Sequence, residues 1–146
     1  VCTGNTCRSP MAAGLARKLI AERLGCRAGD LTDRGILVES AGTSGGLGGA
    51  ATNAKAVMAR RGVDLSDHSA ATLSADLLGQ ADYVFVMTQA HLKTVERLAP
   101  ANSDRVAMLL NDDDVTDPFG GSEEDYERCA AVLERGLRER LREVVL

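Results

Sequence analysis

A cysteine and an arginine near the start of the chain have the spacing of an oxyanion site. Five residues separate Cys2 from Arg8, and Ser9 and Pro10 then open a stretch with helical periodicity. The planar guanidinium of Arg8 suits a phosphate or another tetrahedral oxyanion. Backbone N–H groups of a loop that leads into a helix also point at such an anion. The same positive field favours the thiolate of Cys2, which is the nucleophilic form.

The residues within this spacing support the same interpretation. Gly4 and Asn5 tolerate left-handed backbone conformations, which a tight loop around an anion requires. The hydroxyl of Ser9 can donate a hydrogen bond to the sulfur of Cys2, which helps the sulfur to ionise and later to leave. The sequence therefore predicts a nucleophile at Cys2, followed by a phosphate-binding loop formed by Thr3, Gly4, Asn5, Thr6, Cys7 and Arg8.

A carboxylate late in the chain could complete the site. The alcohol or amine part of a phosphate ester or amide departs slowly unless its oxygen or nitrogen is protonated. Attack by cysteine therefore needs a general acid. Asp117 is the candidate, because Pro118 restricts its backbone and can aim its side chain, and Phe119 can form a pocket wall. An ordinary Asp-Pro turn is the alternative. The consecutive acids at 112–114 predict no metal site, because their side chains diverge.

These residues define a reaction in two steps. Cys2 attacks phosphorus to form a phosphocysteine while Asp117 protonates the departing group. Water, deprotonated by Asp117, then hydrolyses the intermediate, and Arg8 and the loop amides stabilise the charge on the phosphoryl oxygens. No metal or other cofactor is required for this chemistry.

Strands that alternate with helices are expected to position the two loops. A helix is predicted from Pro10 to about Leu24, with Ser9 as its cap and Gly25 as its end. Further helices are predicted over residues 52–61, 74–79, 88–98 and from Ser122 onward, and strands over residues 36–41, 83–87 and 105–109. Val1-Cys2 is interpreted as the tail of a buried strand.

This order of elements predicts an α/β fold, a single three-layer αβα domain over residues 1–146 with a central four-stranded parallel sheet. The first strand is largely missing at the N-terminus, which leaves room for an upstream segment. Ligands of such sheets bind beyond the carboxyl ends of the strands, so the Cys2 and Asp117 loops should share a crevice.

Two further features receive a structural interpretation. The glycine-rich residues 42–49 predict a flexible connector rather than a phosphate cradle. His91 is expected at the surface.

Composition limits the partners and the setting. The net charge of −4 argues against nucleic acid as the main partner, and no run approaches the ~20 apolar residues of a membrane span. The four cysteines lack the density of a disulfide scaffold and the paired spacing of a zinc site. They indicate a reducing, cytoplasmic setting, and nothing in the sequence demands more than a monomer.

Over nearly its full length the chain resembles the low-molecular-weight protein tyrosine phosphatase family, which acts on phosphorylated proteins. Residues 2–10 resemble its phosphate loop, residues 117–119 its general-acid loop, and residues 40–43 and 67–68 two supporting motifs. The resemblance implies that a hydrogen-bond network holds the loop in a strained shape, formed by Asn5, Ser9, Ser40 and His68. It also implies that Cys7 can form a reversible disulfide with Cys2. Without the resemblance, His68 would be an ordinary surface histidine.

Thr6 carries information about the substrate. Tyrosine-specific members of the family usually have an aliphatic residue there, whereas threonine is typical of the bacterial protein arginine phosphatases, which residues 87–88 and 117–122 also resemble. The Thr6 hydroxyl can orient a polar phosphoguanidinium, an effect of ~1 kcal/mol. Phosphoarginine is therefore the predicted substrate, with Thr6 and Phe119 as specificity residues. Phosphotyrosine is the alternative, in which Thr6 is a neutral exchange.

Two other functions stay open. Arsenate reductases of related fold share a similar first loop, but they need further cysteines to relay a disulfide. Residues 87–90 contain no cysteine where a relay residue is expected, and Cys26 and Cys129 are distant in sequence. A non-catalytic phosphate-binding module is the other possibility, and the presence of Cys2, Arg8 and Asp117 together favours an enzyme.

Overall fold

The computed structural model describes residues 1–146. The α-helices are α1 (Arg8–Leu24), α2 (Thr52–Arg60), α3 (Ala75–Gln80), α4 (Gln89–Leu98) and α5 (Glu123–Leu141). The strands are β1 (Val84–Val86) and β2 (Val106–Met108), and the short 3₁₀ helices are η1 (Ala28–Asp30), η2 (Thr32–Arg34) and η3 (Pro100–Arg105). None of the helices has both the length and the apolar character needed to cross a membrane.

The regular sheet is a parallel pair, with Val84 of β1 opposite Val106 of β2. Single bridges extend it, since Cys2 pairs with Gly42, and Met87 N–H donates to Val1 O at 3.1 Å. The predicted strand over residues 36–41 is wrong as a regular strand. No neighbouring segment donates or accepts backbone hydrogen bonds along residues 37–40, so the extended chain there has no ladder to join.

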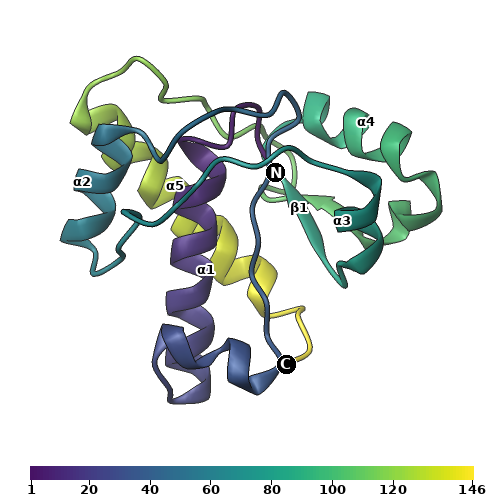
Figure 1. Ribbon diagram of the computed structural model, residues 1–146, viewed down its shortest axis with the longest axis horizontal. Coiled ribbons are helices and arrows are strands. Elements are labelled where there is room, and N and C mark those ends of the chain that lie inside the picture. The colour runs from purple at the N-terminus through teal and green to yellow at the C-terminus, as the bar shows by residue number, and fades with distance from the viewer.

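Helices cover both faces of this sheet. Val84 and Val86 pack against α3 and α4 in a smaller core, whereas Phe85 packs against the larger core built by α1, α2 and α5. Side chains alternate between the two faces of a strand, which explains why neighbouring residues enter different cores. Figure 1 shows the same division, with α1, α2 and α5 on one side of β1 and α3 and α4 on the other.

The helix ends show how the sequence sets the elements. α1 begins at Arg8 rather than Pro10, and the predicted capping role of Ser9 is wrong because Ser9 lies inside the helix. Gly25 ends α1 in the left-handed conformation with φ 66°, as predicted. Thr88 and Ser122 cap the predicted helices α4 and α5, since their side chains accept hydrogen bonds from backbone N–H groups of these helices.

Three loops gather at one end of the molecule (Figure 1). They are the segment before α1, the glycine-rich residues 42–49 and the segment between β2 and α5. The last of these is tied to the end of β1, because Val115 N–H donates to Met87 O at 2.8 Å and Gln89 N–H donates to Asp114 Oδ1 at 2.8 Å. The fold therefore brings the two predicted halves of the site together.

Candidate active site

The carbonyl groups of the N-terminal loop point outward and are hydrogen-bonded by surrounding segments. These bonds run from Thr43 N–H to Cys2 O (2.9 Å), Ser44 N–H to Thr3 O (3.0 Å), His68 Nε2–H to Asn5 O (2.7 Å) and Ala51 N–H to Thr6 O (2.9 Å). No backbone N–H of residues 3–8 donates a hydrogen bond within the chain. The N–H and C=O of a trans peptide point in opposite directions, so these N–H groups face into the loop and form a cradle for an anion.

Asn5 fixes the shape of this loop. It is completely buried and has a left-handed backbone with φ 58°, a conformation that asparagine adopts more readily than most residues. Its Oδ1 accepts from Ala71 N–H at 2.9 Å, which orients the amide. Its Nδ2 therefore donates to Ser9 Oγ at 2.7 Å and to Ser40 Oγ at 2.9 Å.

This network reaches the predicted nucleophile. Because Ser9 Oγ accepts from Asn5, its own proton is free to donate to Cys2 Sγ, which lies 2.9 Å away. Cys2 is only 3% exposed at the base of the loop. The structure thus brings Asn5, Ser9, Ser40 and His68 together around the loop that contains Cys2.

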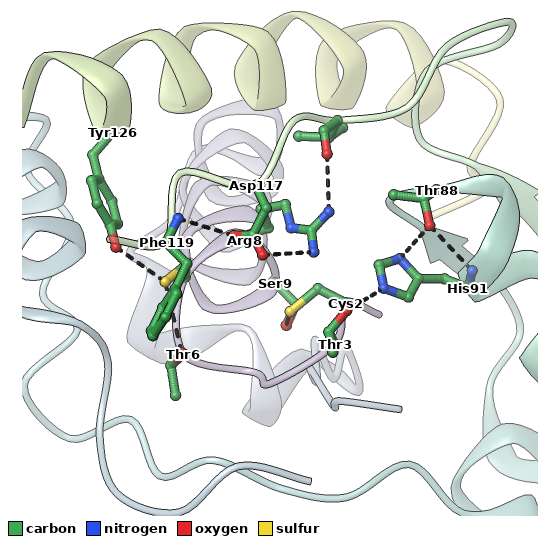
Figure 2. A network of polar contacts seen from close by, with 12 residues as sticks. Cys2, Thr3, Thr6, Arg8, Ser9, Thr88, His91, Asp117, Phe119 and Tyr126 are labelled. Carbon is green, nitrogen blue, oxygen red and sulfur yellow. Dashed lines mark hydrogen bonds and ion pairs between the residues drawn. The ribbon is translucent and has the colours of Figure 1, made fainter. Parts of the chain in front are cut away.

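Arg8 and Asp117 meet across the opening of the loop. The Arg8 side chain is buried, donates through Nη1 to Val115 O at 3.0 Å and places Nη2 3.4 Å from Asp117 Oδ2. The Asp117 side chain is 48% exposed, and Phe119 N–H donates to its Oδ1 at 3.1 Å. Figure 2 shows Asp117 beside the Arg8 guanidinium, with the exposed Phe119 ring on the side of Thr6. A tetrahedral anion in the cradle would lie between a thiol and a carboxyl group.

Thr6 and Cys7, the two other candidate residues within the loop, lie beside each other. Thr6 Oγ1 is 3.7 Å from Cys7 Sγ, and Cys7 Sγ is 3.3 Å from the hydroxyl of Tyr126 in α5. Burial and the neighbouring Cys7 raise the pKa of Tyr126. All four cysteines are free thiols, and burial raises the pKa of Cys129 to about 12. No three side chains of His, Cys, Asp or Glu are grouped so that they could hold a metal ion.

The glycine-rich segment is packed against the loop rather than acting as a connector alone. A Cβ on Gly42 would lie 2.4 Å from Thr3 O, and a Cβ on Gly46 would lie 2.2 Å from Gly4 O. Only glycine permits backbones to approach so closely. We call residues 42–46 the glycine collar, because they cover the outer side of the loop and supply two of its carbonyl partners.

His91 is buried, so the prediction of a surface position is wrong. It is 5% exposed, its Nε2 lies 2.8 Å from Thr3 Oγ1 and its Nδ1 lies 3.0 Å from Thr88 Oγ1. Burial, followed by the nearby Arg8, lowers its pKa to about 4. The signal in the sequence is its spacing from Thr88. The third residue after a helix cap can fold back toward that cap, here at the end where the loops gather.

Comparison with known proteins agrees with this geometry. The family model described as low molecular weight phosphotyrosine protein phosphatase matches residues 1–145. A protein-arginine-phosphatase of Bacillus subtilis (strain 168) is 37% identical over 145 residues, which cover 95% of this chain and 90% of that protein. A probable low molecular weight protein-tyrosine-phosphatase, EpsP, of Ralstonia solanacearum is 33% identical, with coverage of 94% and 88%.

A solved structure extends the likeness to three dimensions. A variant of the arginine phosphatase YwlE, with a phosphorylated active-site serine, superimposes with a TM-score of 0.79 at 34% identity. The match covers 97% of this chain and 91% of that chain.

Proposed function

Because the chain belongs to the low molecular weight phosphotyrosine protein phosphatase family and is a low-molecular-weight protein phosphatase, we propose that Cys2 is its nucleophile and phosphoarginine in proteins its substrate. The observation that carries the catalytic assignment is the 2.9 Å contact between Cys2 Sγ and Ser9 Oγ, at the base of the inward-facing N–H groups.

In the first step, the thiolate of Cys2 attacks phosphorus and the bond from phosphorus to the departing group breaks. The Ser9 hydroxyl stabilises the thiolate, since a hydrogen bond to the charged form favours that form. Arg8 and the N–H groups of residues 3–8 hold the phosphoryl oxygens. Asp117, in its protonated form, gives its proton to the departing nitrogen or oxygen.

In the second step, Asp117 takes a proton from water, which attacks the phosphocysteine and releases phosphate and the Cys2 thiolate. The YwlE variant with a phosphorylated active-site serine supports this path, because it places a phosphoryl group on a side chain of a related site. Arg8 is anchored to Val115 O, so its fork is held in place for both steps.

Thr6 is the residue on which the choice of substrate rests. Its side chain lies on the side of the loop where Figure 2 shows Phe119. A hydroxyl can orient the N–H groups of a phosphoguanidinium, which an aliphatic side chain cannot, and one such hydrogen bond corresponds to ~1 kcal/mol. Phosphotyrosine is the second candidate, favoured by the Phe119 ring, which is 75% exposed and available to contact another aromatic ring.

Hydrolysis of matched phosphoarginine and phosphotyrosine peptides tests the assignment. We expect wild type to have the higher kcat/KM for phosphoarginine, and Thr6→Ile to shift the ratio toward phosphotyrosine by about fivefold to tenfold. Cys2→Ser should abolish turnover, whereas Cys26→Ser, a change at a half-buried thiol away from the loop, should not. A wild type that prefers phosphotyrosine, or a ratio that Thr6→Ile leaves unchanged, would refute the choice of phosphoarginine.

A further inference from the structure

One hydroxyl at the opening of the loop is joined to a buried histidine. Thr3 follows Cys2 directly, and its side chain is exposed, although its Oγ1 lies 2.8 Å from Nε2 of the buried His91. Figure 2 shows the imidazole between Thr3 and Thr88, on the opposite side of Cys2 from Thr6 and Phe119. The reaction described above uses neither the Thr3 side chain nor His91.

Thr3 lies on the side of the loop where the departing group must be. The cradle N–H groups and the buried Arg8 surround the phosphoryl oxygens, with Cys2 at the base. In-line attack places the departing group opposite the attacking sulfur, and therefore at the open side of the loop. An exposed side chain at that opening meets the departing group rather than the phosphoryl oxygens.

The hydrogen bonds of His91 determine what Thr3 can offer. Thr88 Oγ1 accepts from His91 N–H at 3.2 Å and also lies 3.0 Å from Nδ1. A neutral ring can accept through Nε2 while Nδ1–H donates to Thr88 Oγ1, which has a second lone pair for it. In that tautomer Thr3 donates its proton to His91, and its oxygen lone pairs are free to face the departing group.

The oxygen acceptor of Thr3 favours a departing group that carries N–H donors, and the charges around His91 are mixed, with Arg8 and the N-terminal amine as cations and Asp114 and Asp117 as acids. Burial and Arg8 keep His91 uncharged at neutral pH, with its pKa lowered to about 4, so the ring does not repel a cation. Asp114 and Asp117 are the acidic groups that act on His91. A guanidinium group meets an oxygen acceptor here, with negative charge on Asp114 and, once Asp117 has given up its proton, on Asp117 as well. A phenol oxygen has no N–H to donate.

We propose that the Thr3 hydroxyl, held as an acceptor by His91, is a second specificity contact for a guanidinium departing group, opposite Thr6. Thr3 contacts the substrate, and His91 is a positioning residue that acts through Thr3. This inference rests on the proposed phosphoarginine activity.

The test compares peptide hydrolysis by variants of both residues. We expect Thr3→Val to lower kcat/KM for a phosphoarginine peptide by about tenfold. The kcat/KM for p-nitrophenyl phosphate should fall by much less than the value for the phosphoarginine peptide, and Cys26→Ser, a change away from the loop, is the control that should leave both values unchanged. Thr3→Ser, which keeps the hydroxyl, should retain the activity toward phosphoarginine.

The dependence of His91 on Thr3 is tested with double variants. His91→Phe, and His91→Gln as a second form if the first folds poorly, should cause the same selective loss in the presence of Thr3. Neither should add to the loss in the Thr3→Val background. Thermal unfolding of each variant separates this effect from a change in stability.

The outcomes distinguish this inference from the function on which it rests. If wild type prefers phosphoarginine but Thr3→Val leaves the substrate ratio unchanged, the inference alone is wrong. It is also wrong if the His91 variants slow all substrates equally and additively with Thr3→Val, because that result indicates a purely structural histidine. A wild type without preference for phosphoarginine overturns both proposals.

Discussion

At the scale of single residues, Asn5 links more of the site than any predicted catalytic group. Its side chain bonds to Ser9, Ser40 and the N–H of Ala71, and its carbonyl accepts from His68. Because its backbone has φ 58°, the residue also places the loop in a conformation that most side chains oppose.

Two substitutions separate these contributions of Asn5. Asn5→Ala should lower the free energy of unfolding by about 2–4 kcal/mol, because it removes the side-chain hydrogen bonds and adds backbone strain. Asn5→Gly, which keeps the left-handed backbone at no steric cost, should be more stable than Asn5→Ala by about 1 kcal/mol. Denaturant unfolding measures both values, and equal stability of the two variants would contradict the role of the backbone.

Some of these site residues can be predicted from the sequence and others cannot, for a physical reason. The spacing of Cys2 and Arg8 follows from the chemistry of anion binding within one loop, and Asp117 from the need for an acid. His68 follows only from resemblance, because its partner is a backbone carbonyl of a distant segment. The contact of His91 with Thr3 spans 88 positions in the sequence, so helical periodicity alone does not reveal it.

At the scale of elements, the glycine collar couples one loop to another without side chains. Its N–H groups donate to the carbonyls of Cys2 and Thr3, and Gly46 lies against Gly4. The geometry of the cradle therefore depends on the absence of side chains at Gly42 and Gly46, in a segment that contributes none of the predicted catalytic groups.

A single methyl group tests this dependence. Gly46→Ala would place its Cβ 2.2 Å from Gly4 O, so one of the two backbones must shift. We expect the inhibition constant of inorganic phosphate to rise by about tenfold or more, since the cradle N–H groups lose alignment. Gly29→Ala is the matched control, because nothing lies within 4 Å of a Cβ there. Unchanged phosphate inhibition in Gly46→Ala would show that the collar does not shape the cradle.

Helices are predicted more accurately than strands in this chain. The caps of α4 and α5 and the glycine that ends α1 act within a few residues, so local sequence is enough to predict them. A strand needs a partner from elsewhere in the chain, and residues 37–40 are extended without one. The coarser α/β class follows from the alternation of elements, whereas the number of regular strands does not.

At the scale of the whole molecule, His91 couples protonation to global unfolding. Its imidazole joins the N-terminal loop to the start of α4, near Asp114 and Asp117 of the acid loop. In the folded protein burial and Arg8 lower its pKa from 6.5 to about 4. The unfolded chain therefore binds this proton at higher pH than the folded protein does.

The contribution of His91 to stability should be fully present above pH ~6.5 and should be lost as the pH falls to ~4. The difference between the two pKa values corresponds to about 3 kcal/mol at the acid end of this range. Denaturant unfolding gives the free energy of unfolding of wild type and His91→Phe at each pH in this range. The difference between the two proteins isolates the contribution of His91, because the other groups titrate in both. His68→Gln is the control and should retain the dependence seen in wild type. Parallel curves for wild type and His91→Phe would refute the prediction.

The partners of the N-terminal loop have a consequence for how the protein reaches its active form. The bond from His68 to Asn5 closes a separation of 63 positions, and the bond from Arg8 to Val115 closes one of 107. Closing such long stretches costs chain entropy before any contact compensates for it. We therefore expect helical structure to return early during refolding and catalytic competence to return last, so that recovered turnover reports the completion of the topology.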